Sequence, residues 1–286
     1  MWRESIAKES KAFEDAEDFK FLPRGAKPPK GYKMIPVFMV FDIKTDLRRK
    51  SRFVAGGHVT GPPIAEKFAS VALTESVLLI FLLADLNQLD ILAGDVGNAY
   101  LNAFTNEKVY AIAGPEFGER AGQIMLIQKA MYGLKTSGNR WHAPFSSTLR
   151  SLDFFPSKAD ENMWIKNCGK WNEYIVVHTD DFLIASKKPQ EIMDKLQKVY
   201  TIKDPGPPKY MLGFDIYRRG NFWTFGLKTY VKQAIERVEK LFGTIKKERI
   251  PMVKGDHPEQ DQSPLLGAQD IEFYQMLIGM ARWIVH

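Results

Sequence analysis

Two apolar, β-prone segments flank a pair of adjacent aspartates in the second half of the chain. Residues 174–177 read Tyr-Ile-Val-Val, residues 182–185 read Phe-Leu-Ile-Ala, and His178-Thr179-Asp180-Asp181 lies between them. Runs of this length and composition, joined by a short polar connection, predict a β-hairpin with acidic residues at its tip. Because aspartate also favours turns, turn formation alone is a sufficient explanation of the pair.

A third carboxylate could meet this pair from a neighbouring strand. The apolar run Leu89 to Ala93 predicts a short buried strand, and Asp95 lies at its end. Three carboxylates can hold two divalent cations, and Mg²⁺ prefers such hard oxygen ligands. Two ions about 3.5–4 Å apart assist in-line attack of a hydroxyl group on a phosphate. Without metal, clustered acids repel one another and at least one pKa rises. Asp95, Asp180 and Asp181 therefore predict a two-metal site for nucleotidyl transfer.

The overall charge is consistent with a polyanionic partner. The 286 residues include 40 Lys and Arg against 34 Asp and Glu, which gives a net charge of +6 and a pI near 9.1. Ordinary solubility explains this excess equally well. Cys168 is the only cysteine, so the chain can form neither an internal disulfide nor a cysteine-rich zinc site, which fits a reducing compartment.

No segment predicts a signal peptide or a membrane span. The first residues lead into a charged amphipathic stretch rather than a basic start and an apolar run. The longest apolar run, Val77 to Ala84, is interrupted by Asp85 and is far shorter than the roughly 20 residues that cross a bilayer. We expect no membrane partner and an intracellular location, with cytoplasmic particles and the nucleus both open.

The remaining patterns predict a mixture of helices and hairpins. Helical spacing of apolar residues is found over residues 2–17, 75–87, 192–200, 229–242 and 271–285, and hairpin patterns are found over residues 34–55 and 211–227. Thr74 is expected to cap the second helix, whose apolar residues cover most of its circumference and predict burial. Gly243 is expected to end the fourth helix. The turn of the first hairpin is expected at Lys44–Asp46, and a polar loop is expected from Pro251 to Pro264.

The second arm of the first hairpin is strongly basic. Arg48, Arg49, Lys50 and Arg52 fall within five residues. Such a cluster could bind phosphates, but charged residues also protect the edges of sheets, and this second explanation is slightly favoured on the cluster alone.

Six segments occur in a fixed order along nearly the whole chain. Two of them contain the acids: Asp95-Val96-Gly97-Asn98-Ala99-Tyr100-Leu101 and His178-Thr179-Asp180-Asp181. The other four are Lys50 to Gly57, Ala130 to Trp141, Tyr210 to Asp215 and Tyr274 to Gly279. The first two resemble the first catalytic motif and the Tyr-x-Asp-Asp turn of retroelement reverse transcriptases. Lys50 to Gly57 resembles the fingers motif of the copia-type retrotransposon branch, and Ala130 to Trp141 resembles its Tyr-Gly-Leu-Lys signature. The chain as a whole therefore resembles this branch.

The resemblance implies a right-hand polymerase fold of the α+β class, with fingers, palm and a partial thumb. The palm would be built on a ferredoxin-like strand-helix core. The implied division is 1–70 for the N-terminal helix and fingers hairpin, 71–227 for the palm with an inserted fingers segment and the primer-grip hairpin, and 228–286 for the start of the thumb and a truncated connection.

The resemblance also implies roles for single residues. Asp95 and Asp180 would bind two Mg²⁺ ions, with Mn²⁺ as a possible substitute, and Asp181 would be a weaker ligand or an electrostatic support. The implied nucleotide-binding residues are Arg52, Lys50, Val96, Tyr100 and Thr136. The implied template-primer residues are His178, Met211, Leu212 and Gly213.

Some of these roles have a simpler explanation in the sequence alone. Tyr100 would lie under the nucleotide sugar, where its ring excludes a 2′-hydroxyl group, but an aromatic at this position is also typical of a core. Lys50 could simply be solvated. The segment 211–213 would grip the primer end, yet an ordinary hairpin explains its pattern.

The sequence departs from the family pattern at two of these positions. His178 stands where the family usually has Tyr or Phe, and it is smaller and can gain charge near neutral pH. Thr136 stands where many members have Gln. The chain also ends before the ribonuclease H region, and the protease, integrase and capsid segments are absent, so we expect these to act in trans.

The implied activity is RNA-directed DNA polymerisation, a nucleotidyl transfer from deoxynucleoside triphosphates to the 3′-hydroxyl of a primer on an RNA or DNA template. The alternative is a catalytically decayed retroelement fragment that only binds nucleic acid, and His178 motivates it. A nucleotide cyclase with a similar palm is less favoured, since the sequence has no cyclase-type glycine-rich acidic turn.

Overall fold

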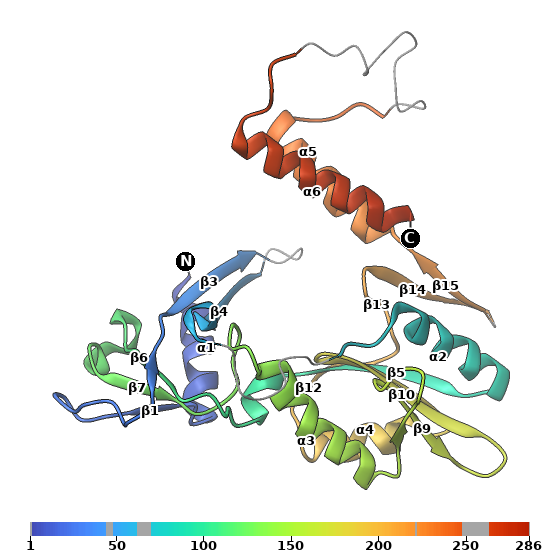
Figure 1. Cartoon of the computed structure of the whole chain (residues 1–286). Coiled ribbons are helices and arrows are strands. Elements are labelled where there is room, and N and C mark those ends of the chain that lie inside the picture. The colour runs from blue at the N-terminus through green and yellow to red at the C-terminus, as the bar shows by residue number, and fades with distance from the viewer. Residues whose placement is uncertain (1, 44–47, 62–69, 221, 248–262, 286) are drawn as a thin grey trace. The chain divides into compact units, whose positions relative to one another are not determined.

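A computed structural model describes residues 2–43, 48–61, 70–220, 222–247 and 263–285 of the chain. These residues form both helices and strands, which confirms the predicted α+β class (Figure 1). The chain divides into two compact units, Met1–Pro208 and Lys209–His286. The predicted turn at Lys44–Asp46 and the predicted polar loop as far as residue 262 lie outside the described residues. The division into fingers, palm and thumb stays a prediction, because it follows functional regions rather than compact units.

A six-stranded antiparallel sheet lies at the centre of the first unit, with the strand order β12-β5-β11-β10-β9-β8. Its strands are β5 (Asp90–Val96), β8 (Phe155–Pro156), β9 (Met163–Asn167), β10 (Asn172–His178), β11 (Asp181–Ser186) and β12 (Ile202–Gly206). Helix α3 (Ser137–Ser151) comes between β5 and β10, and α4 (Pro189–Gln197) joins β11 to β12. This β-α-β-β-α-β connection is the ferredoxin-like core that the sequence predicted.

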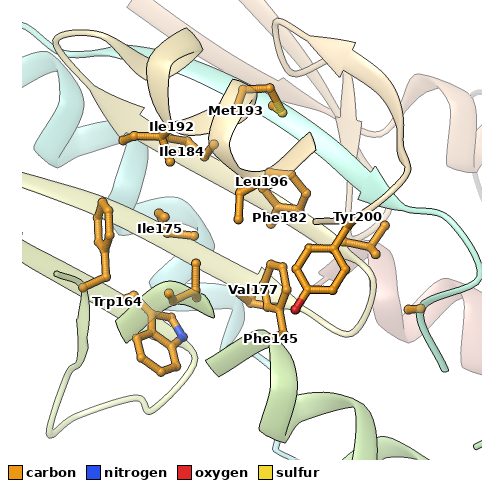
Figure 2. Close-up of a cluster of buried hydrophobic side chains, with 14 of the residues drawn as sticks. Phe145, Trp164, Ile175, Val177, Phe182, Ile184, Ile192, Met193, Leu196 and Tyr200 are labelled. Carbon is orange, nitrogen blue, oxygen red and sulfur yellow. The ribbon is translucent and has the colours of Figure 1, made fainter. Parts of the chain in front are cut away.

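Helices α3 and α4 pack on one face of this sheet and form the main core with it (Figure 2). Phe145 of α3, Phe182 of β11 and Leu196 of α4 are all buried there. Full burial of one large apolar side chain stabilises a fold by about 1.5–3 kcal/mol. The core therefore holds the strands that carry the acids in a fixed frame.

Helix α2 (Thr74–Asn87) packs on β10 and β11, and two predictions about it are wrong. Only one side of the helix is buried, and Leu86 is 71% exposed. Thr74 is the first helical residue rather than the cap. The carboxylate of Asp160, far away in the sequence, accepts a hydrogen bond from Leu73 N at 3.0 Å at this helix end instead. Burial raises the pKa of the Asp160 carboxyl, but hydrogen bonds from Ser76 and the nearby backbone lower it, and the pKa lies below its ordinary value as a result.

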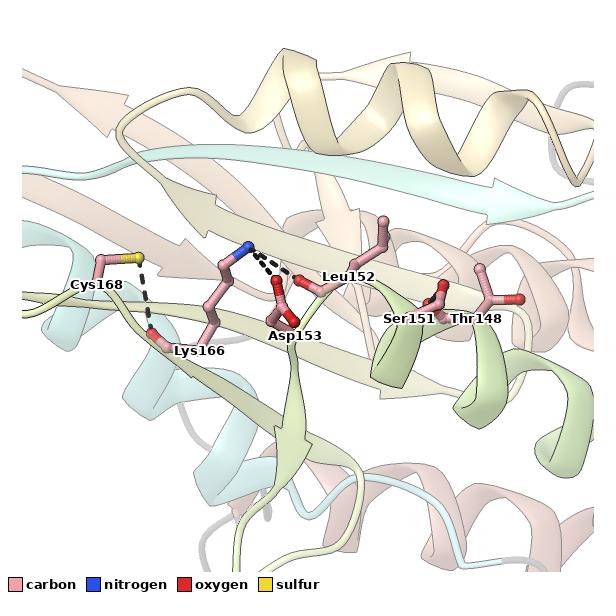
Figure 3. A network of polar contacts seen from close by, with 6 residues as sticks. All are labelled: Thr148, Ser151, Leu152, Asp153, Lys166 and Cys168. Atoms are coloured by element: carbon pink, nitrogen blue, oxygen red, sulfur yellow. Dashed lines mark hydrogen bonds and ion pairs between the residues drawn. The ribbon is translucent and has the colours of Figure 1, made fainter.

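The end of α3 is fixed by a lysine from β9. Lys166 Nζ donates a hydrogen bond to Leu152 O at 2.9 Å and lies 3.6 Å from Asp153 Oδ2 (Figure 3). A cation at a helix C-terminus compensates the unpaired carbonyl groups there.

The N-terminal part of the first unit contains α1 (Arg3–Asp15) and the hairpin of β3 (Val37–Ile43) and β4 (Arg49–Ala55), as predicted. A four-stranded sheet, not predicted, has the order β1-β7-β6-β2. Its strands are β1 (Phe19–Phe21), β2 (Lys33–Met34), β6 (Val109–Ile112) and β7 (Ile124–Ile127). Three short 3₁₀ helices are η1 (Gly57–Val59), η2 (Ala99–Asn102) and η3 (Pro115–Arg120).

The second unit contains a three-stranded sheet and two helices. The strands are β13 (Tyr210–Met211), β14 (Phe214–Arg219) and β15 (Phe222–Gly226), and the helices are α5 (Lys228–Phe242) and α6 (Ala268–Val285). Gly243 ends α5 with a φ of 75°, as predicted. Among the described residues, no helix has the length and apolar character that a membrane span requires.

Asp18 joins α1 to the four-stranded sheet from a fully buried position. Its Oδ1 atom accepts hydrogen bonds from Gln128 N at 3.2 Å and Lys129 N at 2.6 Å. Burial raises the pKa of this carboxyl from 3.8 to about 7, and the two backbone N–H groups only partly offset the rise. The folded state therefore favours the protonated form of Asp18.

We predict that Asp18→Asn weakens the pH dependence of stability. A folded pKa above the unfolded one stabilises the protein fully below pH 3.8, and this contribution is lost as the pH rises through about 7. This difference between the folded and unfolded pKa corresponds to at most about 4 kcal/mol. Urea unfolding at pH 5 and pH 8 should show a smaller loss of unfolding free energy for the variant than for the wild type. An equal loss in both proteins would contradict the burial of an ionisable Asp18.

Candidate active site

The register of the central strands brings two of the predicted acids together. Asp181, the first residue of β11, pairs directly with Asp95 of β5. Directly opposed residues of an antiparallel pair point to the same face, with Cβ atoms about 4.5–5.5 Å apart. The next pairs place His178 of β10 opposite Asp181, and Lys203 of β12 opposite Asp95. Four adjacent strands thus present His178, Asp181, Asp95 and Lys203 in one row.

Lys203 places a cation directly beside Asp95 in this row. Its Nζ atom lies 3.8 Å from Asp95 Oδ1, and both side chains are partly exposed. An ammonium group at this distance reduces the repulsion between the acids, although solvent screens much of the effect.

Asp180 lies at the tip of the hairpin, in a two-residue turn between His178 and Asp181. Its partner in the turn, Thr179, has a φ of 60°, which is strained for a β-branched residue. Two hydrogen bonds hold the turn: Trp141 Nε1 donates to Thr179 O at 2.8 Å, and Val96 N donates to Asp180 O at 2.7 Å. The tip is therefore tied both to α3 and to the strand of Asp95.

Two tyrosines lie close to Asp180, and an arginine contacts one of them. The rings of Tyr100 and Tyr132 form an edge-to-face pair with centroids 5.0 Å apart. Burial raises the pKa of Tyr132 to about 12, and the negative charge of Asp180 acts in the same direction. Burial and then Asp180 also raise the pKa of Tyr100. The Arg52 guanidinium lies over the Tyr132 ring, 5.7 Å from its centroid.

Arg52 and Lys50 both belong to strand β4, and Arg52 reaches Tyr132 from there. Arg52 also lies 3.8 Å from Asp42 of the neighbouring strand. Burial raises the pKa of Glu9 on α1, and a hydrogen bond from Phe53 N and the charges of Lys50, Arg52 and Lys203 only partly offset the rise. Glu9 is therefore close both to the basic arm and to Lys203, which pairs with Asp95.

Close backbone contact fixes this hairpin to the loop that carries Tyr132. Ala55 N donates to Tyr132 O at 2.7 Å. A Cβ atom added at Gly133, whose φ is 89°, would overlap the carbonyl oxygen of Ala55, and one added at Gly57 would overlap the carbonyl of Gly133. Lys135 Nζ adds a hydrogen bond to Thr60 O at 2.6 Å. Only glycine at positions 57 and 133 therefore allows the two backbones to come this close.

Val96 and Thr136, both expected to bind nucleotide, present buried side chains. Val96 lies in the main core, which leaves only its backbone near the acids. The Thr136 hydroxyl lies 2.9 Å from Glu107 Oε1 and 3.1 Å from Asn106 Oδ1. Their predicted contact with a nucleotide stays a prediction.

The expected primer-grip residues belong to the second unit. Met211 is buried, and Leu212 and Gly213 form the turn between β13 and β14. They are therefore not in the compact unit that contains the acids.

The acids have the donor chemistry that Mg²⁺ requires. Within the part of the chain that the structure describes, no three or more Asp, Glu, His or Cys side chains form a preassembled metal site. Mg²⁺ is commonly held by one or two carboxylates with substrate phosphates and water completing its shell, so the paired Asp95 and Asp181 with Asp180 at the adjoining tip fit this ion.

No role was predicted from the sequence for two residues of this site, Tyr132 and Lys203. Tyr132 lies within the Tyr-Gly-Leu-Lys signature, so its motif was an available signal. Lys203 lies in an unremarkable charged segment, and only the pairing of β12 with β5 brings it to Asp95.

Comparison with known proteins confirms the family resemblance. The sequence model of a family described as reverse transcriptase (RNA-dependent DNA polymerase) matches residues 24–254. The Retrovirus-related Pol polyprotein from transposon RE1 of Arabidopsis thaliana is 26% identical over 252 residues, which cover 84% of this chain and 17% of that protein. The putative transposon Ty5-1 protein of Saccharomyces cerevisiae is 28% identical over 191 residues, 65% of this chain and 61% of the relative. The chain thus spans less than two thirds of both relatives.

A further curated relative and one solved structure are similar over most of the chain. The Retrovirus-related Pol polyprotein from transposon TNT 1-94 of Nicotiana tabacum is 28% identical over 225 residues, 73% of this chain and 17% of that protein. The solved structure is a foamy viral protease-reverse transcriptase in complex with double-stranded DNA. It is 15% identical, with a TM-score of 0.47, and the match covers 80% of this chain and 36% of that one.

We predict that Gly133→Ala destabilises the first unit far more than Gly122→Ala. Both glycines have positive φ, so both substitutions cost about 1–2 kcal/mol of backbone energy. Only the new methyl at position 133 meets backbone, whereas nothing lies within 4 Å of the one at position 122. We expect the unfolding free energy of Gly133→Ala to be lower by a further 1–3 kcal/mol or so. Equal losses in urea unfolding would refute the close backbone contact.

Proposed function

The chain belongs to the reverse transcriptase (RNA-dependent DNA polymerase) family, and from this membership we propose that it catalyses RNA-directed DNA synthesis as the polymerase domain of a copia-type retrotransposon. Its relatives are Pol polyproteins of transposons. The observation that carries the proposal is the pairing of Asp95 with Asp181 beside the Asp180 turn, since this arrangement offers carboxylates to one reacting phosphate group.

Asp95 and Asp180 would hold two Mg²⁺ ions, with Asp181 as a weaker ligand or an electrostatic support and Mn²⁺ as a possible substitute. When bound, such ions activate the primer 3′-hydroxyl and stabilise the leaving pyrophosphate. Lys203 keeps a positive charge beside Asp95, which limits the mutual repulsion of the acids.

Arg52 would bind the incoming triphosphate, with Lys50 as a further phosphate contact. A guanidinium group donates several hydrogen bonds in a planar fork and suits phosphate oxygens. The position of Arg52 over the Tyr132 ring, on a hairpin fixed through Gly133, supports this role because the side chain is oriented before a nucleotide arrives. Val96 would contribute its backbone to the nucleotide pocket, and the buried side chain of Thr136 would support the wall of that pocket.

Tyr100 would select the sugar of the incoming nucleotide. Its half-buried ring packs edge-to-face against the ring of Tyr132, which restricts its movement. A ring fixed under the sugar excludes a 2′-hydroxyl group by overlap. Deoxynucleoside triphosphates would therefore be the substrates.

The partner would be an RNA or DNA template-primer. His178 would contact it near the primer end, and Met211, Leu212 and Gly213 would position that end.

A second candidate function is nucleic-acid binding without synthesis, and His178 favours it. His178 stands where the family usually has Tyr or Phe, and its Nδ1 atom is buried without a hydrogen-bond partner among the described residues. Salt-dependent binding of a template-primer without extension would support this function, because phosphate contacts survive the loss of catalytic geometry. Extension restored by His178→Tyr would then assign the defect to this one side chain.

We predict primer extension on an RNA template in the presence of Mg²⁺, and its loss in Asp180→Asn. Loss of one charged group at the reacting phosphate should lower kcat by at least about a hundredfold. Asp194→Asn provides the matched control, because Asp194 is an exposed acid on α4 away from the row. Template-primer binding should persist in both variants. Purified wild-type protein that extends no primer would exclude the polymerase proposal.

We predict that Tyr100→Ala lowers the preference for deoxynucleotides over ribonucleotides by about tenfold or more, the factor that corresponds to about 1.4 kcal/mol of lost steric exclusion. Tyr100→Phe keeps the ring and should keep the preference. The ratio of kcat/KM for matched deoxynucleoside and ribonucleoside triphosphates measures the effect. A preference unchanged in Tyr100→Ala would remove the sugar-selecting role.

A further inference from the structure

The turn between β13 and β14 has a backbone conformation that its own sequence does not favour. Met211 pairs with Phe214, so Leu212 and Gly213 are the two central residues. Both have positive φ, 50° for Leu212 and 85° for Gly213. Two-residue turns with this feature ordinarily carry Asn, Asp or Gly, and a leucine there is strained. The conformation therefore depends on contacts from outside the turn.

Trp283, close to the end of α6, supplies such a contact. A Cβ atom added at Gly213 would lie 2.8 Å from Trp283 Nε1 and 3.3 Å from Cε2. The indole thus packs directly on the bare Cα of Gly213. Its Nε1 atom is buried and has no hydrogen-bond partner in the described part of the chain, so shape rather than hydrogen bonding makes the contact.

The indole is itself held by two neighbouring rings. Its centroid lies 6.0 Å from that of Phe214 and 6.4 Å from that of Tyr230. Tyr230 belongs to α5, whose first turn is anchored on β14: Asp215 accepts hydrogen bonds from Thr229 N at 2.8 Å and from the Thr229 hydroxyl at 2.5 Å. Elements from both helices therefore converge on this one turn, and α5 and α6 lie side by side (Figure 1).

We propose that Trp283 is a positioning residue for the primer end. It fixes the Leu212-Gly213 turn and acts on the primer only through that turn. The inference rests on the proposed role of Met211, Leu212 and Gly213 as the primer grip. It also extends the polymerase unit to α6, because the matched family region ends at residue 254, before this helix begins.

A smaller side chain at position 283 would leave a cavity against Gly213 and allow Leu212 to relax toward a common negative φ. The turn would then change its path, while the row of acids and the hairpin of Arg52, which belong to the other compact unit, would keep their own contacts. Misplacement of the primer end by even about 1 Å lowers the rate of the chemical step strongly. Nucleotide binding would change little.

The test compares Trp283→Leu with Tyr274→Leu, which removes a 56% exposed aromatic from the same helix. Single-turnover extension on preformed template-primer complexes gives the maximal rate of incorporation and the apparent Kd for deoxynucleotide, and binding gives the template-primer Kd. We expect Trp283→Leu to lower the maximal rate at least tenfold with both Kd values changed less than about threefold, Tyr274→Leu to leave all three unchanged, and Trp283→Phe to recover most of the rate. Loss of template-primer affinity with an unchanged rate in the bound complex would overturn the proposal, since it indicates only a loosened helix.

Hydrogen exchange tests the contact independently of synthesis. Protection of residues 210–216 should fall in Trp283→Leu and persist in Tyr274→Leu. If the wild type extends no primer, the proposed function fails while this measurement still decides whether Trp283 fixes the turn, and unchanged protection would refute it. Should Trp283→Leu not fold, Gly213→Ala against Gly243→Ala serves instead: both have positive φ, but only the first methyl meets the indole. We expect lost protection and rate in Gly213→Ala alone, and equal behaviour of the two would overturn the proposal.

Discussion

The pairing of β11 with β5 is the constraint on which the candidate site depends. A slip of one residue would send Asp181 to the opposite face of the sheet and bury it in the main core. The side chain after it prevents this slip: Phe182 pairs with Gly94, and a Cβ atom at Gly94 would lie 2.7 Å from both Phe182 Cζ and Ile202 Cγ2. The ring needs a bare backbone beneath it, and β5 has only this glycine in its length. Packing in the core thus determines which acids meet on the other face.

A second close approach connects the basic hairpin to the same frame. Gly133 and Gly57 let two backbones come together where any side chain would overlap a carbonyl oxygen. As a result, Arg52 and Tyr132 meet through segments about 80 residues apart, and Tyr132 in turn holds Tyr100 beside the acid tip. In both contacts a missing side chain, rather than a functional one, determines where the reactive groups lie.

Local patterns in the sequence predicted the elements but not their long-range partners. The apolar runs around Asp180 predicted the hairpin because alternation and turn chemistry are properties of neighbouring residues. The cap of α2 was predicted wrongly, because Asp160 reaches it from more than 80 residues away, and no local rule can place that contact. Lys203 and Trp283 escaped assignment for the same reason: strand pairing brings the first to Asp95, and helix packing brings the second to Gly213. The four-stranded sheet was missed because its strands are short and widely separated.

Family membership and catalytic competence depend on different parts of this framework. The glycine contacts and the core side chains fix the frame, and they persist whatever residue occupies position 178. His178 pairs with Asp181 at the end of the row and is absent from the main core, so its identity does not set the register of the acids. The features that identify the family and the half-buried side chain at position 178 therefore belong to different parts of the site. The neighbouring Thr179 is strained, and hydrogen bonds from Trp141 and Val96 to the carbonyl groups of the tip hold it without the side chain of His178.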